Sequence, residues 1–138
     1  MKRPAIWGVN HLKLAAKDVK TTQVFYTDVV GLEYIPEFDH KTAQGELFAV
    51  MLKIPHNDTE ILVEVRHNQD QAEKQQGWDP ITWGVRRKKD LDTWRVWFEE
   101  RDVKCSKVFT GLKGWVLCAL GKRVGFRKLS RYILQPLT

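Results

Sequence analysis

Two residues of this chain, His11 and Glu64, have the side-chain types that bind metal ions or move protons. A neutral imidazole nitrogen and a carboxylate oxygen both suit divalent Zn, Ni, Fe or Mn. In a site shielded from water, the same two groups could instead work without a metal, with Glu64 as the catalytic general base. Both lie in the first half of a chain that repeats itself. The position that matches His11 in the second half is Thr82, a poor metal ligand.

The repeat is visible as residues that recur at a nearly fixed interval. Thr82 follows His11 by 71 positions (82 − 11), Asp102 follows Gly31 by 71 (102 − 31), and Gly114 follows Gly45 by 69 (114 − 45). Self-similarity of this kind fixes the architecture before any single residue is interpreted. Because only two copies are present, the pattern predicts a pseudo-twofold domain and not a solenoid.

Each half is predicted to be a βαβββ unit. In the first, Asp18 can begin a helix with one apolar face, and Gly31 stands where a left-handed cap would end it. The strands are predicted at residues 6–15, 32–38, 45–54 and 60–66 in the first unit, and at 81–86, 103–109, 114–119 and 124–134 in the second, whose helix is predicted to start at Asp90. We therefore expect one domain of two repeats, about 5–66 and 80–136, joined by a polar linker at 67–79 with a short helix at 69–76.

Composition narrows the class of protein. The 138 residues suit one domain with its own core, and the longest apolar run, 47–52, is far too short to cross a membrane. No signal peptide is recognised, so we expect a cytoplasmic protein without a membrane partner. Residues 101–138 hold nine Lys/Arg against Asp102 alone. These basic residues accompany no known nucleic-acid motif, so a solvated basic face is the preferred interpretation.

The order of elements resembles the vicinal oxygen chelate superfamily, which includes glyoxalases, bleomycin resistance proteins and extradiol dioxygenases. The resemblance rests on His11 in the first strand, on Glu64 in the fourth, and on the helix end Phe25-Tyr26-Thr27-Asp28-Val29-Val30-Gly31-Leu32-Glu33. It implies an α+β fold in which two βαβββ units form a cupped mixed sheet with the helices outside. It also implies a metal site with ligands from the first and fourth strands of each unit.

Carried over to this chain, those ligand positions are only half filled. His11 and Glu64 are suitable ligands, whereas the second-unit positions map to Thr82 and Ser130, which are not. Relatives usually carry an Asp-Pro-x-Gly turn before the last strand, and segment 119–126 lacks it. The resemblance to a metal-dependent lyase and dioxygenase family thus leaves the question of enzyme activity open.

Two functions remain open at this point. One is a small-molecule binding protein, without a cofactor, that holds a partly apolar, anionic ligand in the cup. The alternative is a lyase, isomerase or dioxygenase that depends on a divalent metal (Zn, Ni, Mn or Fe). Strand alternation puts several further side chains beside the cup, and we predict that they bind the ligand: Lys13, Arg66, Thr82, Arg86 and Trp115, together with His11.

Two expectations concern packing. We expect Trp94 and Trp97, on the second helix, to lie in the core against the sheet. We also expect a homodimer, because exposed sheet edges invite association and most soluble oligomers are C2 dimers. Cys105 and Cys118 fall on neighbouring predicted strands, where a cross-strand contact is open, although small apolar fillers are the preferred interpretation.

Overall fold

The chain is described from a computed structural model, which covers residues 3–56, 61–75, 77–78, 80–111, 114–121 and 130–136. It divides into two compact units, residues 1–72 and 73–138, and each is described by itself. Residues 57–60, which include the first residue of the predicted fourth strand, lie outside the described residues, as does segment 122–129, which includes the start of the predicted last strand. The cup that the two sheets were predicted to form stays a prediction.

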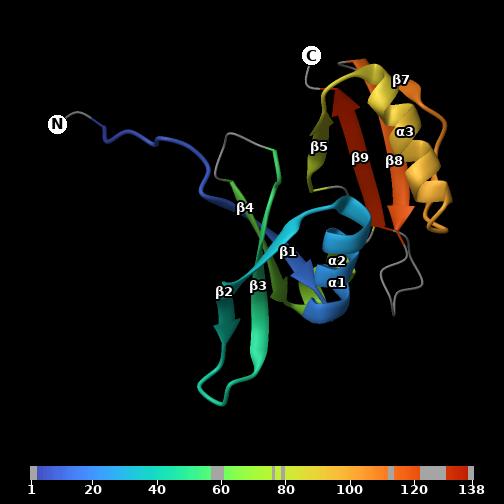
Figure 1. Cartoon of the computed structure of the whole chain (residues 1–138). Helices are drawn as coiled ribbons and strands as arrows, with labels where there is room; N and C mark the ends of the chain where they lie inside the picture. The colour runs from blue at the N-terminus through green and yellow to red at the C-terminus, as the bar shows by residue number, and fades with distance from the viewer. Residues whose placement is uncertain are drawn as a thin grey trace. The chain divides into compact units, whose positions relative to one another are not determined.

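The first unit has the predicted βαβββ order (Figure 1). Its elements are β1 (His11–Ala16), α1 (Val19–Phe25) with a following π-helical turn (Tyr26–Val30), β2 (Glu33–Lys41), β3 (Leu47–Lys53) and β4 (Leu62–His67). The sheet order is β1-β4-β3-β2, in which β1 and β4 are parallel and the other pairs are antiparallel. The last strand of the unit therefore returns beside the first, which brings residues far apart in the sequence into register.

Local sequence explains the helix. The Asp18 carboxylate accepts a hydrogen bond of 2.6 Å from the Thr21 amide, which satisfies one of the free N–H groups of the first turn. Gly31 ends the π-helical turn with φ 85°, a left-handed conformation that a glycine adopts without strain. Both cap positions were predicted from the sequence, and both are confirmed.

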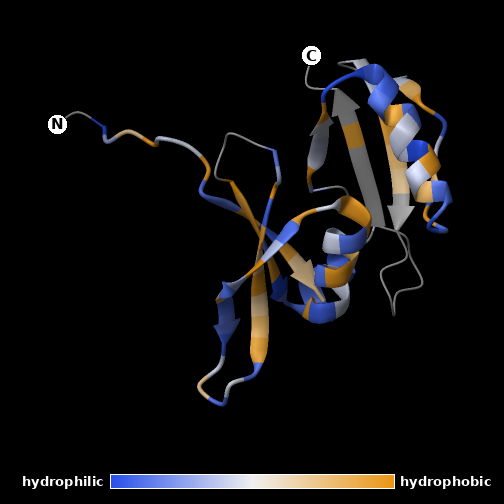
Figure 2. Ribbon diagram, in the orientation of Figure 1, coloured by the Kyte–Doolittle hydropathy of each residue, from blue (hydrophilic) through white to orange (hydrophobic). Residues whose placement is uncertain are grey.

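The core of the first unit lies between α1 and one face of the sheet. Strand β3 is hydrophobic along most of its length (Figure 2), as expected for a central strand. The buried side chains on the helix-facing side alternate along the strands: Leu14, Ala16, Val50, Leu52, Val63 and Val65. The other face of the same sheet carries the polar residues that concern function.

The second unit repeats the plan with a broken second strand. Its elements are β5 (Thr82–Val85), α3 (Lys88–Glu99), β6 (Lys104–Cys105), β7 (Phe109–Gly111), β8 (Gly114–Gly121) and β9 (Ser130–Pro136), and the short helix α2 (Gln69–Lys74) precedes them. The order is β5-β9-β8-β6, with β7 also paired to β8. Both units are α+β with a mixed sheet, as predicted. No helix in the described part of the chain has the length and hydropathy needed to cross a bilayer.

Three local predictions were wrong. Residues 3–10 are not in a strand, and β1 begins only at His11. Helix α3 begins at Lys88, because Arg87 and not a residue near Asp90 adopts the extended N-cap conformation. Trp97, expected in the core, is exposed.

The two cysteines do not make the cross-strand contact that the sequence left open. Cys105 is paired with Ala119, the neighbour of Cys118. Successive residues of a strand point to opposite faces, so the two thiols leave the sheet on opposite sides. Cys105 contacts the Arg95 carbonyl oxygen of α3 at 3.8 Å, which fixes its side as the one that faces the helix. A direct cross-strand contact between the thiols is therefore not made.

Candidate functional site

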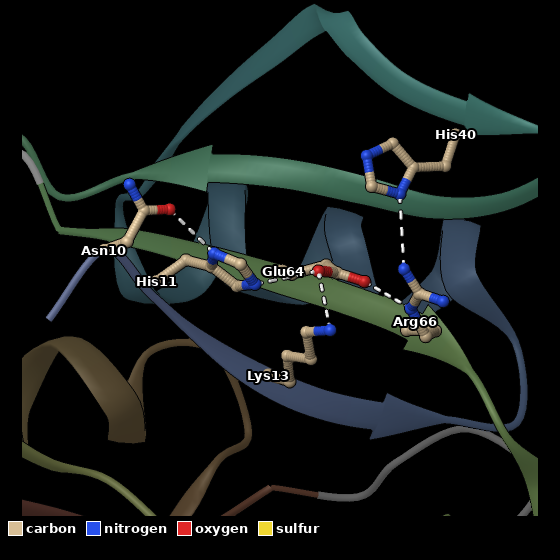
Figure 3. A network of polar contacts seen from close by, with 6 residues as sticks. All are labelled: Asn10, His11, Lys13, His40, Glu64 and Arg66. Carbon is tan, nitrogen blue, oxygen red and sulfur yellow. Dashed lines mark hydrogen bonds and ion pairs between the residues drawn. The ribbon is translucent and has the colours of Figure 1, made fainter.

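A cluster of charged side chains lies on the face of the first sheet that α1 does not cover. In the parallel pair of β1 and β4, Lys13 is in register with Glu64. Side chains of alternate residues share a face, so His11 and Arg66 lie on the same side as this pair. Figure 3 shows the four side chains converging above β1 and β4.

Glu64 is the centre of the cluster, and its side chain is only 2% exposed. Its Oε2 atom lies 3.3 Å from His11 Nε2 and 3.8 Å from Lys13 Nζ. Its Oε1 atom accepts a hydrogen bond from Arg66 Nε. Both carboxylate oxygens are therefore engaged by basic side chains of the same sheet (Figure 3).

A second layer of contacts holds the basic side chains in place. His11 Nδ1 lies 2.9 Å from Asn10 Oδ1, and Arg66 Nη2 lies 3.4 Å from His40 Nδ1 on β2. The Arg66 guanidinium also stands 5.2 Å above the centre of the Phe48 ring, within the range of a cation–π contact. Arg66 is thus positioned from two directions, while its side chain keeps 39% of its surface exposed.

Positive charge exceeds negative charge at this site. One carboxylate, Glu64, faces two basic side chains, Lys13 and Arg66, and the Lys13 side chain is 58% exposed. Because the carboxylate is buried and the cations reach solvent, an approaching molecule meets the basic groups first. An arginine fork and a lysine ammonium in this position suit a carboxylate, phosphate or phosphonate group.

The same geometry bears on the expected metal site. The 3.3 Å between His11 Nε2 and Glu64 Oε2 would let both atoms reach one ion at ordinary ligand distances. However, Arg66 already occupies Oε1 and the Lys13 ammonium lies beside Oε2. Across the described residues, no three His, Cys, Asp or Glu side chains gather into a group that could hold a metal ion. His11 and Glu64 are thus the two candidate ligands that the described residues bring together, and basic side chains already engage the carboxylate.

The register of the second sheet corrects one of the expected ligand positions. Thr82 is paired with Ile133, and Gly84 is paired with Gln135, just as Lys13 is paired with Glu64. The repeat counterpart of Glu64 is therefore Gln135, and the interval of 71 gives the same residue (64 + 71 = 135). Ser130, the position expected from the sequence, is paired with Gly121 at the far end of β9.

The remaining predicted ligand-binding residues belong to the second unit. Thr82 is exposed on β5, and Arg86 is exposed in the bend that follows it. Trp115 lies on β8, and Lys88 Nζ, from the first residue of α3, stands 3.4 Å from its ring centre. Trp115 alternates with Leu117 and Ala119, both fully buried. The Trp115 ring is therefore on the side of the sheet that faces the helix, which does not favour a role in lining a cup.

Sequence reasoning missed His40 and Phe48, the two residues that hold Arg66 from outside its own strand. The register between β2 and β3 shifts between Ile35 and His40, so counting alternate positions along β2 could not have assigned His40 a face. Strand alternation does predict that Arg66, two positions after Glu64, shares its face of the sheet. It gives no indication that His40 and Phe48 contact Arg66.

Comparison with known proteins was informative only at the level of structure. No protein-family model matches the chain, and no curated protein matches it. Among solved structures, the fosfomycin resistance protein FosX from Listeria monocytogenes is similar at a TM-score of 0.68 and 13% identity, over 97% of this chain and 94% of that one. This chain has the vicinal oxygen chelate fold.

Two further similar structures agree with that assignment. A lactoylglutathione lyase from Agrobacterium tumefaciens has a TM-score of 0.63 at 16% identity, over 94% of this chain and 93% of that one. A member of the glyoxalase, bleomycin resistance and dioxygenase superfamily from Sphaerobacter thermophilus has a TM-score of 0.65 at 17% identity, over 94% and 96%. At such identities the likeness shows the fold, and the chemistry has to be argued from the side chains of this chain.

Proposed function

We propose that this protein binds a small anionic molecule at the cluster around Glu64, without a metal cofactor. The observation that supports this most strongly is the surplus of basic groups: Lys13 and Arg66 both contact the one buried carboxylate and both reach solvent. The partly apolar ligand class follows from the neighbouring Phe48 ring, which lies beneath the Arg66 guanidinium.

Glu64 orients the basic groups in this proposal. With Oε1 bonded to Arg66 and Oε2 beside His11 and Lys13, neither oxygen is directed at a ligand. A general base needs an oxygen within hydrogen-bond reach of the proton that it removes. This geometry therefore favours a role for Glu64 in positioning the basic side chains over the predicted role as a catalytic base.

The metal-dependent alternative is favoured by one distance, the 3.3 Å between His11 Nε2 and Glu64 Oε2. One similar structure, a FosX variant, is described with Mn(II) and a dihydroxypropylphosphonic acid. That structure holds both a metal and an anion, so this fold accommodates the ligands of either function. The choice has to come from ligand measurements on this chain.

The test is a thermal-shift and calorimetric screen of small anions at low ionic strength. The probes are a phosphonate, a phosphate monoester and a dicarboxylate, each paired with its uncharged ester. A ligand that binds only the folded protein raises its melting temperature. We expect at least one anion, and none of the esters, to do so, and we expect Lys13→Gln to weaken its affinity about tenfold, which corresponds to about 1.4 kcal/mol.

Lys107→Gln is the matched control, because Lys107 is an exposed lysine of the other unit. If Lys107→Gln weakened binding as much as Lys13→Gln, the attraction would be that of the whole basic chain and the proposed site would be wrong. If no anion bound, and Zn, Ni, Mn or Fe(II) raised the melting temperature of the wild type but not of His11→Ala, the metal-dependent alternative would replace it.

A further inference from the structure

A β-bulge in the first sheet brings the Phe48 ring among the side chains of the charged cluster. His40 on β2 is paired with Ala49, and the next residue of β2 is paired with Leu47. Phe48 is therefore an extra residue of β3. Ala49 is paired with Arg66 and shares its face, so regular alternation would turn Phe48 to the opposite side. The Phe48 ring nevertheless lies 5.2 Å from the Arg66 guanidinium and 5.8 Å from the His40 ring, a change of direction that bulges commonly produce beside functional sites.

These contacts fix the direction of the Arg66 guanidinium. Its Nε atom donates a hydrogen bond to Glu64, and its Nη2 atom donates one to His40 Nδ1 at 3.4 Å (Figure 3). A guanidinium has five N–H donors and no acceptor, so the proton of the His40 ring is on Nε2. Among the contacts of the described residues, two of the five donors are used and three remain (5 − 2), including both on Nη1. The outer edge of the guanidinium, formed by Nη1 and Nη2, is therefore open to a ligand.

Charge and shape both favour a carboxylate as the ligand of this edge. At pH 7 and with His11 neutral, Lys13, Arg66 and Glu64 together leave a surplus of one positive charge (1 + 1 − 1). A monoanionic ligand balances this charge, whereas a dianion leaves the site negative. The two Nη atoms of a guanidinium also match the two oxygens of a planar carboxylate, which accepts two parallel hydrogen bonds. A sulfonate carries the same charge on three oxygens that do not all lie in the guanidinium plane, so it separates shape from charge.

We propose that His40 and Phe48 are positioning residues that make this site selective for carboxylates. The inference rests on the proposed function, the binding of an anion beside Glu64. His40 holds the Nη2 atom of Arg66, and the Phe48 ring supports the guanidinium from one side. The Nη1–Nη2 edge then presents two parallel donors to one carboxylate, and the exposed Lys13 ammonium adds a second positive charge from β1. Without the His40–Phe48 support, Arg66 would still attract anions but would no longer distinguish them by shape.

The first experiment compares carboxylates with sulfonates that carry the same organic group, by calorimetry at low ionic strength. The probe pairs are benzoate with benzenesulfonate and pentanoate with butanesulfonate. Wild type is expected to bind a carboxylate about tenfold more tightly than its sulfonate, the effect of about one hydrogen bond. His40→Leu and Phe48→Leu should each bring this ratio close to one. His40→Asn should keep it, because the amide oxygen can accept the hydrogen bond in place of Nδ1. Phe109→Leu is the control, because Phe109 is an exposed Phe of the other unit.

The outcomes separate the selectivity from the proposed function. If wild type bound both members of each pair equally, or if His40→Leu and Phe48→Leu kept the wild-type ratio, the selectivity would be wrong while the anion site would stand. If neither these probes nor the phosphonate, phosphate monoester and dicarboxylate bound, the proposed function and the inference would fall together.

The second experiment tests the positioning of Arg66 without a ligand. Nuclear magnetic relaxation of the Arg66 Nε–H group, assigned by its loss in Arg66→Lys, reports the motion of the guanidinium. We expect a well-ordered group in wild type and in His40→Asn, and a lower order parameter in His40→Leu and Phe48→Leu at an unchanged melting temperature. An order parameter equal to that of the wild type in both Leu variants would overturn the positioning role.

Discussion

Removal of the Glu64 charge is the sharpest test of the site. Glu64→Gln keeps the shape of the side chain but replaces one oxygen by an NH2 group. That group would face either Arg66 or the pair His11 and Lys13, all of which are held by the carboxylate. We expect the variant to fold with a smaller free energy of unfolding. The reason is that the basic side chains assembled around the carboxylate would lose their common negatively charged partner.

The expected magnitude follows from the exposure of the partners. Breaking a fully buried ion pair costs about 3–5 kcal/mol, while exposed pairs contribute about 0–1 kcal/mol. Glu64 is almost fully buried, but Arg66 and Lys13 remain in contact with water. We therefore place the cost of Glu64→Gln at about 1–3 kcal/mol, and its coupling with Arg66→Gln in a double-mutant cycle at about 1–2 kcal/mol.

Urea denaturation at pH 7, followed by circular dichroism, gives the four free energies of the cycle. Because the chain has two compact units, hydrogen exchange of the amides in residues 61–67 is measured in parallel, so that the loss is assigned to the unit that contains Glu64. Glu46→Gln is the control, because Glu46 is an exposed glutamate in the turn before β3. It should change stability by less than about 0.5 kcal/mol.

The reasoning would be refuted if Glu64→Gln fell within the range of the Glu46 control. A coupling energy near zero would be equally damaging, because Arg66 would then gain nothing from the contact that defines the site. A variant more stable than wild type would mean that burial of the carboxylate costs more than its partners return. In that case the cluster would be retained for binding alone.

Three smaller effects follow from the remaining contacts. Asp18→Ala should lower the free energy of unfolding by about 1 kcal/mol and Asp18→Asn by far less, as measured in urea, because Asn also caps. The hydrogen bonds from Thr21 hold the pKa of Asp18 below its usual value. This stability is present above the unfolded pKa and is lost as the pH falls through the folded one, so wild type and Asp18→Ala should differ less in acid. The hydrogen bond of 2.7 Å from Tyr34 to Asp39 raises the pKa of Tyr34 to about 12. The bond should stabilise the fold below pH 10 and be lost as the pH rises toward 12, and an ultraviolet titration should show one late tyrosine that is missing in Tyr34→Phe. Burial raises the pKa of the Cys105 thiol, so it should react with a disulfide reagent at pH 8 more slowly than free cysteine, and an equal rate would contradict its position against α3.

The fold could be predicted because its signals are local and repeated. Asp18 and Gly31 mark the two ends of the first helical segment through backbone geometry that other residue types satisfy less well. The strands follow from apolar runs bounded by turns. Prediction was weaker where those signals are ambiguous: Ile6 and Trp7 have the apolar character of a strand, yet residues 3–10 form no strand, and β1 begins after them.

The site could be predicted only in part, because the residue types of a strand do not determine which residues of the neighbouring strand it pairs with. His11 and Lys13 are two positions apart on β1, and Glu64 and Arg66 are two positions apart on β4. Strand alternation therefore predicted correctly that each pair shares a face of the sheet. His40 could not be found in this way because the register of β2 shifts. Ser130 was expected in place of Gln135, which lies one position beyond the end of the predicted last strand, 124–134. The fixed interval of 71 residues would have given Gln135 directly.

The corrected register also explains why only one unit carries the cluster. At the pair of positions where the first unit has Lys13 and Glu64, the second has Gly84 and Gln135. Glycine has no side chain to contribute a charge, and an amide cannot hold cations as a carboxylate does. The two units thus share the order of strands, but the charged pair of the first unit is not repeated at the matching positions of the second. The affinity of the proposed anion site should depend on the first unit alone, so Gln135→Ala should leave binding unchanged where Lys13→Gln weakens it. Equal losses in the two variants would mean that both units contribute to one site, and the proposal of a one-sided site would fail.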